Sequence, residues 1–571
     1  MKEKISLLLQ EALFQCVGEE GIPLLERPKN PDHGDYAYSG GLALARARKE
    51  DPRALAKKII ENLPSSPYVE SAEVAGPGYV NIHLSAAAHA EAVREVLKEQ
   101  KRFGHKPPTG KKVLAEFVSA NPTGPLHIGH GRGAALGATV VNLLQTQGFS
   151  VEKEYYLNDA GRQIQILAFS TWLRIMEAKG FLKGLPDGVY KGDYVREMAH
   201  AYLAKDPASW LPPPQTLLQA ISAEVLEEKK EAHLDALVAA AKDFLGPRFA
   251  LLVEHCIEAQ TQSIRLDLER FRVTFDHWVS ERRLYGEGAV KKAVLRLQEK
   301  GHVFEADGAL WFRATAFGDE KDRVLVRHGG EPTYFAADLA YHLQKYERGF
   351  DVLLNFWGAD HHGYAPRLKG GLTALGLDAQ KLEILFVQFV SLFRGKERVS
   401  MSTREGEFTP LSSLVEEVGV DAARFFYCLR KADHPLDFDL DLARARRLEN
   451  PVFYVQYAHA RIESIFSKWG EDKEALRKKE IFLPFGEVEK TLTSKIIEYP
   501  ETLEAAAKER APHLLVQYLI SFARAFHSAY DTIPVLTSGE ATLPRLMLFE
   551  AVRQVIENGL AILGVDAPKE M

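Results

Sequence analysis

Two histidines, His127 and His130, stand where a predicted helix begins. They follow an apolar stretch that predicts a buried strand, and a turn over residues 121–125 that two prolines and a glycine make rigid. The first turn of a helix offers unpaired N–H groups and a partial positive charge, which suit a phosphate. Side chains three apart share one helix face, so both rings can reach the same group. This combination suits nucleotidyl transfer, because preorganised donors stabilise charge that builds on a phosphate.

Three glycines follow at intervals of four: Gly129, Gly133 and Gly137. Each glycine inside a helix costs about 1 kcal/mol relative to alanine, so a strip of three indicates that a nucleotide base or a neighbouring strand approaches the backbone closely. Two other interpretations stay open. The segment can be a tightly packed helix with two surface histidines, or the histidines can be a metal pair, although no third ligand lies nearby in the sequence.

A second polar group, Asp360-His361-His362, follows an apolar strand predicted over residues 350–357. Polar residues at the carboxyl edge of a parallel sheet commonly meet a ligand. A metal cluster and a solvated turn are the alternatives here. We favour a nucleotide contact through His362, with Gly358 allowing close approach, and expect no metal site in the protein itself.

The elements that must position these residues follow a recognisable order. The succession of strand, helix and strand over residues 113–157 predicts a parallel βαβ unit. A second parallel half resumes with strands expected over residues 350–357 and 382–393. Between the halves, residues 165–265 are mostly helical in pattern and predict an insertion. From about residue 411 the pattern is helical throughout, without the internal repeat that marks a solenoid.

The first 108 residues predict a separate α+β unit. Helices are expected over residues 3–18 and 40–63, a hairpin over residues 71–85, and a Gly/Pro-rich linker over residues 103–111. The fold class is therefore α/β: a parallel-sheet domain with a helical insertion, an α+β N-terminal domain and an all-α C-terminal bundle. The expected domain bounds are 1–108, 109–445 and 446–571.

Composition excludes some classes of protein. A chain of 571 residues suggests three or four domains, and 46% apolar with 26% charged residues is ordinary for a globular protein. The three cysteines lie far apart without a CxxC pair, which argues against a disulfide framework or a cysteine zinc site and fits a reducing cytoplasm. No membrane span or secretory signal is expected. The net charge of −6 neither indicates nor excludes nucleic-acid binding.

The sequence resembles a known family at several points. The HIGH tetrapeptide at residues 127–130 resembles the signature of class I aminoacyl-tRNA synthetases, and the longer run SANPTGPLHIGHGRGAALG is similar to the arginyl-tRNA synthetase branch. Further segments resemble that branch in the same order along the chain: GDYAYSGGLALA at 34–45, AGPGYVNI at 75–82, YLNDAGRQ at 156–163, WGADHHGYAPRLK at 357–369 and YVQYAHARI at 454–462.

The resemblance implies a Rossmann-like catalytic domain that joins ATP, with Mg²⁺, to arginine. An aminoacyl adenylate and pyrophosphate would form first, usually with tRNA bound, and the aminoacyl group would then pass to the 2′-OH of the terminal adenosine of tRNA(Arg). The helical tail would read the anticodon region and the N-terminal domain would touch the tRNA elbow. The family's habit also implies a cytoplasmic monomer. The ATP-binding residues that it implies are Pro122, Gly124, His127, Ile128, Gly129, His130, Gly133, Gly358, His362 and Met401.

An arginine site needs acceptors for a planar, permanently charged fork of five N–H donors, and carboxylates supply them. Glu281 and Asp338 match the family pattern, and Tyr334 lies four residues before Asp338 on one helix face. Without the resemblance, both carboxylates would be taken for surface groups. The polar head of arginine would meet the residues at the end of the first strand: Glu116, Ser119, Ala120 and Asn121.

The second class I signature, the KMSKS loop, departs from its pattern. Residues 400–404 read Ser-Met-Ser-Thr-Arg, so neither signature lysine is present. We assign Ser402 and Arg404 to catalysis and expect Arg404, helped by Arg398, to supply the missing charge; unchanged pyrophosphate exchange by Arg404→Ala would refute this. The departure leaves two alternatives: a tRNA-binding paralogue without activity, or a class I synthetase for another amino acid.

The helical tail has aromatic residues at spacing four, which predict a bundle core more readily than anticodon stacking. These are Tyr518, Phe522, Phe526 and Tyr530. Arginines near the bundle entry (Arg444, Arg446, Arg447 and Arg461) can meet phosphates, although a solvated helix face explains them nearly as well. The expected tRNA-binding residues are Arg446, Arg447, Tyr454 and Arg461.

Overall fold

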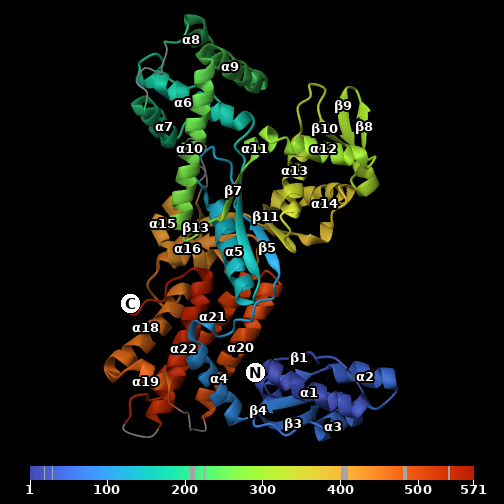
Figure 1. Ribbon diagram of the computed structural model, residues 1–571. Coiled ribbons are helices and arrows are strands. Elements are labelled where there is room, and N and C mark those ends of the chain that lie inside the picture. The colour runs from blue at the N-terminus through green and yellow to red at the C-terminus, as the bar shows by residue number, and fades with distance from the viewer. Residues whose placement is uncertain are drawn as a thin grey trace. The chain divides into compact units, whose positions relative to one another are not determined.

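The computed structural model describes residues 1–18, 20–28, 30–205, 212–223, 226–399, 409–479, 485–537 and 541–571 (Figure 1). The chain divides into two compact units. The first joins Met1–Pro107 with Arg446–Met571, and the second is Pro108–Ala445. The two units are described in turn, beginning with the second.

A five-stranded parallel sheet forms the centre of Pro108–Ala445, with strand order β12-β11-β5-β6-β7. Its strands are β5 (Lys112–Glu116), β6 (Ser150–Leu157), β7 (His277–Ser280), β11 (Val352–Gly358) and β12 (Leu382–Val387). Helix α5 (Ile128–Thr146) connects β5 to β6, so the predicted parallel βαβ unit is confirmed. The chain leaves β5 in one direction for β6 and later returns to its other side as β11. The carboxyl ends of β5 and β11 therefore form a topological switch point, where such sheets bind ligands.

Three helices share one core with the sheet. They are α12 (Ala289–Glu299), α13 (Tyr334–Glu347) and α14 (Ala365–Ala374), and the core includes Leu114 and Leu353. Between α12 and α13 the chain forms a small antiparallel sheet of β8 (Val303–Ala306), β9 (Ala309–Phe312) and β10 (Arg323–Val326). The short helix α11 (Glu281–Gly286) follows β7 directly.

The predicted helical insertion is confirmed. It contains α6 (Arg162–Ala178), α7 (Asp193–Lys205), α8 (Gln215–Ile221), α9 (Lys230–Leu245) and α10 (Pro247–Arg270). These helices pack around a separate apolar core that includes Leu167, Trp172 and Leu237. The insertion is therefore held mainly by its own apolar residues.

Two sequence predictions about the second half of the unit Pro108–Ala445 are wrong. The strand expected over residues 382–393 is two strands, because β12 ends at Val387 and β13 (Val390–Arg394) belongs to another sheet, with β14 (Glu397–Arg398) and β15 (Leu436–Asp439). The chain after residue 411 is likewise not all helical, since β15 pairs in parallel with β13. Its alternation of buried Leu436 and Phe438 with aspartates is too short to stand out from helical neighbours.

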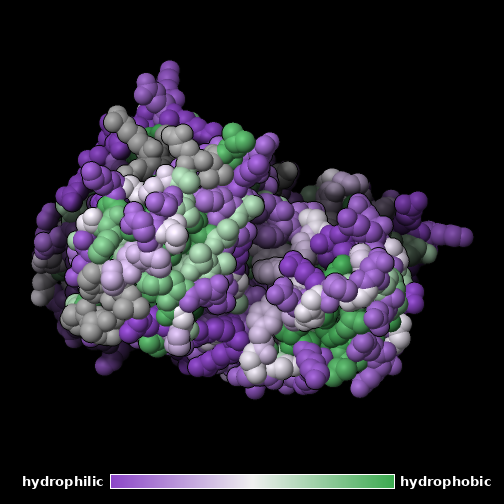
Figure 2. Space-filling model, turned by 90° about the horizontal axis from the view of Figure 1, so that it is seen from above, coloured by the Kyte–Doolittle hydropathy of each residue, from purple (hydrophilic) through white to green (hydrophobic). Residues whose placement is uncertain are grey.

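The surface seen from above is mostly hydrophilic, with separate hydrophobic areas (Figure 2). Scattered exposed leucines are normal for a globular protein. No helix in the described parts of the chain combines the length and the hydropathy needed to cross a membrane.

The N-terminal part of the first unit has an antiparallel sheet of order β1-β2-β4-β3. Its strands are β1 (Leu25–Glu26), β2 (Tyr36–Tyr38), β3 (Val69–Ala75) and β4 (Tyr79–Leu84), and the predicted hairpin is β3–β4. Helix α1 (Lys2–Val17) is present as expected. The single helix predicted over residues 40–63 is instead α2 (Gly40–Arg48) and α3 (Pro52–Glu61). Asp51 accepts a hydrogen bond from the Ala54 N–H and starts a new helix ahead of Pro52.

The C-terminal part of this unit is a bundle of α18 (Pro451–Trp469), α20 (Glu487–Lys508), α21 (Pro512–Thr532) and α22 (Thr542–Leu563), with the short α19 (Lys473–Arg477) beside α22. Helix α4 (Ala86–Glu99) packs against α20 and α22. The aromatic stripe of α21 forms core, because Tyr518, Phe522 and Phe526 are buried. The prediction is confirmed for these three residues, whereas Tyr530 at the end of the stripe is half-buried.

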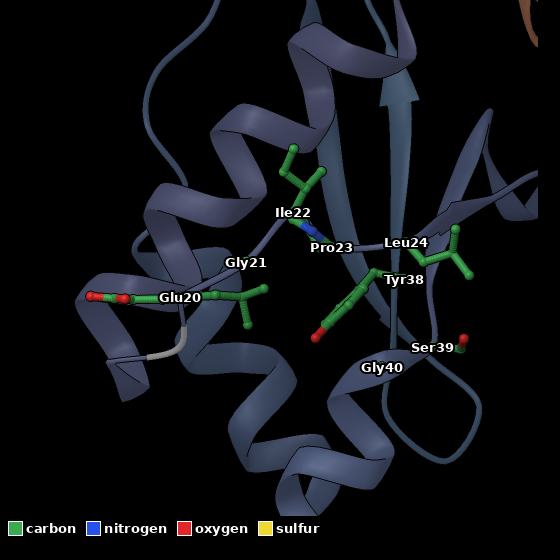
Figure 3. A pocket seen from close by; sticks show the side chains of 9 residues that line it. Glu20, Gly21, Ile22, Pro23, Leu24, Tyr38, Ser39 and Gly40 are labelled. Carbon is green, nitrogen blue, oxygen red and sulfur yellow. The ribbon is translucent and has the colours of Figure 1, made fainter. Parts of the chain in front are cut away.

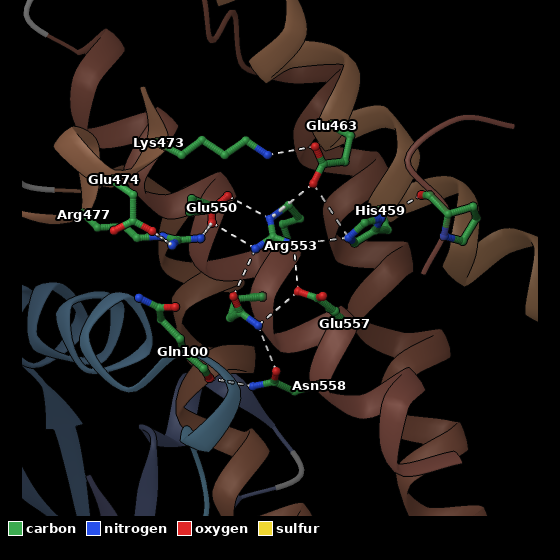
Figure 4. A network of polar contacts seen from close by, with 12 residues as sticks. Gln100, His459, Glu463, Lys473, Glu474, Arg477, Glu550, Arg553, Glu557 and Asn558 are labelled. Carbon is green, nitrogen blue, oxygen red and sulfur yellow. Dashed lines mark hydrogen bonds and ion pairs between the residues drawn. The ribbon is translucent and has the colours of Figure 1, made fainter. Parts of the chain in front are cut away.

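A buried polar network crosses the bundle around Arg553 of α22 (Figure 4). Its guanidinium donates to Glu550 at 2.8 and 2.9 Å and to Glu557 at 2.8 Å. Burial opposes ionisation of Glu550, but hydrogen bonds from Arg553 and Arg477 lower its pKa below the ordinary value. The network extends through Gln554 to Asn558, whose amide donates to the Gln100 carbonyl at 2.8 Å, so it also fixes the segment after α4.

Candidate active site

The two signature histidines cap the helix that they begin. The His127 Nδ1 accepts hydrogen bonds from the backbone N–H groups of Gly129 (3.1 Å) and His130 (3.4 Å). In return, the His127 backbone N–H donates to the His130 Nδ1 at 3.3 Å. The rings stack with centroids 3.6 Å apart, so the prediction that they share one face is confirmed.

This reciprocal cap determines which nitrogen of each imidazole ring carries the proton. Because each Nδ1 accepts a backbone proton, each neutral ring carries its own proton on Nε2. Burial lowers the pKa of His127, and burial together with the nearby His127 lowers that of His130 to about 3. Both imidazoles are therefore neutral N–H donors near pH 7 and not acids or bases.

The loop between β5 and α5 has an unusual backbone. Val118 and Ser119 have φ angles of 69° and 43°, in a region that β-branched residues rarely adopt. Side-chain contacts hold it: the Ser119 hydroxyl donates to Glu116 at 3.0 Å and accepts from the Tyr156 N–H at 3.1 Å. The Ala120 N–H donates to the Tyr155 hydroxyl at 3.0 Å. Strain held in this way is typical of functional sites.

A cavity of about 700 Å³ opens at the switch point. Of the residues expected to bind ATP, it is lined by Gly124, His127, Gly129, His130, Gly133 and Gly358. Pro122 and Ile128 are buried and lie outside the lining. His361 lines the cavity, whereas the ring of His362 lies against Phe386, with centroids 4.6 Å apart. Met401, Ser402 and Arg404 lie outside the described residues.

The glycine strip meets two different surroundings. A Cβ at Gly133 would have no atom within 4 Å, and Gly133 faces the cavity. A Cβ at Gly137 would lie 2.4 Å from the Phe117 ring, so this glycine allows the helix to pack on residues that follow β5. The sequence offered two reasons for glycines in this helix, a ligand and a neighbouring strand. The open space at Gly133 fits the first, and the contact of Gly137 with Phe117 fits the second.

A second cavity of about 490 Å³ adjoins the first. Asn121 and Gln163 line both, and the Asn121 amide donates to the Gln163 side-chain oxygen at 2.8 Å. The second cavity is also lined by Glu281, Tyr285 and Tyr334. The signature histidines therefore line one cavity and Glu281 lines the adjoining one, whereas Asp338 is in the lining of neither.

The two carboxylates predicted to bind arginine are buried: Glu281 is 3% and Asp338 8% exposed. Asp159 fixes Glu281 by accepting from the Ser280 hydroxyl (2.6 Å) and the Arg282 N–H (2.9 Å) on either side of it. The Tyr364 hydroxyl donates to Asp338 at 2.5 Å. Burial raises the pKa of each carboxyl to about 7. The interpretation as two ordinary surface carboxylates is therefore wrong.

Glu116 is the last residue of β5 and is buried. Its carboxylate pairs with the buried Lys345 ammonium, which also donates to the Asn355 oxygen at 3.1 Å. The His342 ring extends this hydrogen-bonded network, because its two nitrogens bond the Asp338 carbonyl (2.8 Å) and the Asn355 side-chain amide (3.0 Å). Glu116 therefore supports Ser119 and helix α13 and is absent from the lining of both cavities.

The raised pKa values predict a pH dependence of arginine binding. A guanidinium favours ionised carboxylates, so the Kd for arginine should rise about tenfold or more as the pH falls from 8 to 6. The stability of the protein without ligand should change with pH in the opposite direction. The folded chain binds these protons more tightly than the unfolded chain, so the free energy of unfolding should fall as the pH rises from about 4 to 7. Calorimetric titration and thermal unfolding measure both, and a flat arginine Kd would contradict the prediction.

Several site residues were missed by sequence reasoning. Tyr285 donates to Glu281 at 3.4 Å, and Tyr364 and Lys345 make the contacts given above. Tyr190, Tyr194 and the exposed Phe389 line the larger cavity, where the Tyr194 hydroxyl donates to the Thr123 carbonyl at 2.9 Å. Periodicity gives no signal for the aromatic residues of helices, such as Tyr194 and Tyr285, because an aromatic residue in a helix is usually core. Tyr190 and Phe389 lie outside helices and strands, where periodicity does not apply.

The predicted tRNA-binding residues lie at the start of the bundle. Arg446 and Arg447 are exposed. The guanidinium of Arg461 lies over the Tyr530 ring at 4.1 Å from its centroid and bonds the His527 Nδ1 at 3.2 Å. The ring of Tyr454 lies 4.5 Å from that of His527.

The N-terminal part holds a further cavity of about 280 Å³, around the ring of Tyr38 (Figure 3). Its lining is mainly small and apolar, with Leu13, Ile22 and Leu24, and Glu20 adds a carboxylate. The described residues that line it include no pair of groups suited to acid–base or nucleophilic catalysis. Nor do the described residues contain a group of three or more His, Cys, Asp or Glu able to hold a metal ion.

The family to which this parallel sheet, with its histidine-capped helix at the switch point, belongs is that of the class I aminoacyl-tRNA synthetases. The family model described as "tRNA synthetases class I (R), catalytic domain" matches residues 92–427. Models for "Arginyl tRNA synthetase N terminal domain" and "DALR anticodon binding domain" match residues 2–84 and 455–571. The chain belongs to the arginyl-tRNA synthetase family.

Individual relatives agree. The chain is 48% identical to an arginine–tRNA ligase of Nitrosospira multiformis, over 98% of each chain. It is 46% identical to an arginine–tRNA ligase of Legionella pneumophila, over 100% of each. The arginyl-tRNA synthetase structure from Thermus thermophilus shares the fold, with a TM-score of 0.76 and 24% identity over the full length of both chains.

Proposed function

We propose that this chain is an arginine–tRNA ligase that forms arginyl-adenylate from ATP and arginine and transfers the arginyl group to tRNA(Arg). The observation that carries this proposal is the connected space at the switch point. The neutral histidine donors at the start of α5 line the larger cavity, and the buried Glu281 lines the adjoining one. Asp338 is outside both linings, but it lies close enough to Glu281 for the two charges to interact. A triphosphate and a guanidinium are the groups that fit these two surroundings.

In the first step, a carboxylate oxygen of arginine attacks the α-phosphorus of ATP, and the bond to the bridging oxygen breaks to release pyrophosphate. His127 and His130 donate from Nε2 to the phosphate oxygens, while Glu281 and Asp338 hold the guanidinium. Asn121 and Ser119 orient the polar head of the amino acid. These groups act by positioning and by electrostatic stabilisation.

Mg²⁺ enters this proposal as the counter-ion of the ATP triphosphate. Asp360 lines the larger cavity, and its carboxylate would be a ligand for this Mg²⁺. The positive charge opposite the departing pyrophosphate would come from Arg404, with Arg398.

In the second step, the 2′-OH of the terminal tRNA adenosine attacks the carbonyl carbon of the adenylate and AMP leaves. We assign tRNA binding to the N-terminal domain (residues 1–108) and the helical domain (residues 446–571), with Arg446, Arg447, Tyr454 and Arg461 among the contacts. The catalytic domain is then residues 109–445. We also propose that the enzyme acts as a cytoplasmic monomer.

ATP–pyrophosphate exchange with arginine in the presence of tRNA(Arg) tests the function. Exchange with arginine and none with lysine or other amino acids is the expected result. Absence of exchange in a folded protein that still binds tRNA would favour a non-aminoacylating paralogue. Repeating aminoacylation at rising salt tests the tRNA contacts, because phosphate contacts weaken steeply with salt; a flat response would contradict them.

A further inference from the structure

Tyr156 has a buried hydroxyl group that makes no hydrogen bond to any described residue. The residue is 5% exposed. Two neighbouring buried tyrosines use their hydroxyls: Tyr155 donates to the Ala120 carbonyl at 2.9 Å and Tyr341 to Glu154 at 2.7 Å. A buried polar group without a partner is unfavourable, and native structures contain few of them. Tyr156 lines neither cavity, but its electrostatic neighbours include Glu281, Tyr285 and Tyr334, which line the smaller one. An orphaned hydroxyl in this position indicates a partner that a ligand supplies.

The parallel sheet and helix α13 place Tyr156 near Glu281 and Asp338, the two carboxylates proposed to bind the guanidinium of arginine. Tyr156 lies opposite Val279 in the β6–β7 pair, two residues before Glu281. Its ring packs on that of Tyr341, with centroids 4.5 Å apart, and Asp338 lies three residues earlier on the same face of α13. Burial first, and then the charges of Glu281 and Asp338, raise the pKa of the Tyr156 hydroxyl, as expected for a phenol close to both.

We propose that the Tyr156 hydroxyl binds the guanidinium group of arginine, as a third acceptor beside Glu281 and Asp338. A guanidinium presents five N–H donors in a plane, and two carboxylates in bidentate contact leave at least one donor for a further acceptor. The phenol oxygen accepts that N–H, and its own proton can bond a carboxylate oxygen. Tyr156 is thus a specificity-determining residue. This inference rests on the proposed function.

The test is the Tyr156→Phe variant, which removes only the hydroxyl. The KM for arginine in tRNA-dependent pyrophosphate exchange should rise about 10- to 100-fold, because a hydrogen bond to a charged group is lost, with the KM for ATP unchanged. The melting temperature without ligand should stay the same or rise, since the hydroxyl has no partner there. A hydroxyl with a purely structural role would instead lower it.

Tyr341→Phe is the matched control. It removes a neighbouring hydroxyl that is bonded to Glu154, so it should lower the melting temperature and leave the arginine KM within about twofold. An arginine KM for Tyr156→Phe within twofold of the wild type would overturn the inference. If the wild-type enzyme shows no exchange with arginine, the proposed function itself fails, so the two failures are distinguishable.

Discussion

Replacing Asp338 with asparagine should lower kcat/KM for arginine by about a thousandfold. Asp338 is 8% exposed and one of two buried carboxylates at the guanidinium end of the site. Removing one partner of a buried charged pair leaves the other without compensation, which typically costs about 3–5 kcal/mol. An asparagine would also point an amide N–H at a group that is entirely donor. Pyrophosphate exchange over a range of arginine concentrations measures the effect.

Two observations control this experiment. The KM for ATP should stay close to the wild-type value, because the histidine end of the space is untouched. The melting temperature of the Asp338→Asn protein without ligand should rise at pH 8, since the wild type must ionise a carboxyl whose pKa is about 7. Asp378→Asn, at an exposed carboxylate that caps a short helix, is the control variant and should keep full activity. A loss below about fivefold at Asp338 would refute its role.

Replacing both His127 and His130 with alanine should lower kcat for adenylate formation by about 10²- to 10³-fold or more. Removing one preorganised donor from a developing anion commonly has an effect of this size. The rate should not follow histidine titration between pH 6 and 8, because burial lowers the pKa of His127 and lowers that of His130 to about 3. Single-turnover formation of adenylate measures the loss.

The histidines also cap helix α5, so a loss of rate could come from the helix alone. His127→Asn separates the two roles. Asparagine is a good N-cap and should keep the melting temperature near the wild-type value, but it cannot place an N–H where the imidazole Nε2 lies. If His127→Asn restored the full rate, or if the double alanine variant formed adenylate normally while folded, the active centre would be wrongly assigned.

Sequence patterns predicted the parallel βαβ unit, the helical insertion, the helical bundle and the face shared by His127 and His130. These features are local: they depend on apolar periodicity, on turns rich in proline and glycine, and on residues a few positions apart. The same reasoning failed where the pattern was short or was interrupted. The apolar run over residues 382–393 holds two strands of different sheets, and Pro52 divides what looked like one helix.

Only the tertiary structure decided which polar residues face the ligand space. It buried Glu281 and Asp338, brought His361 and not His362 to the cavity, and assigned Glu116 to Lys345, 229 residues away. It also left the Tyr156 hydroxyl unpaired. Burial and hydrogen-bond partners depend on contacts between segments far apart in the chain. A pattern that records only neighbours along the chain carries no information about them.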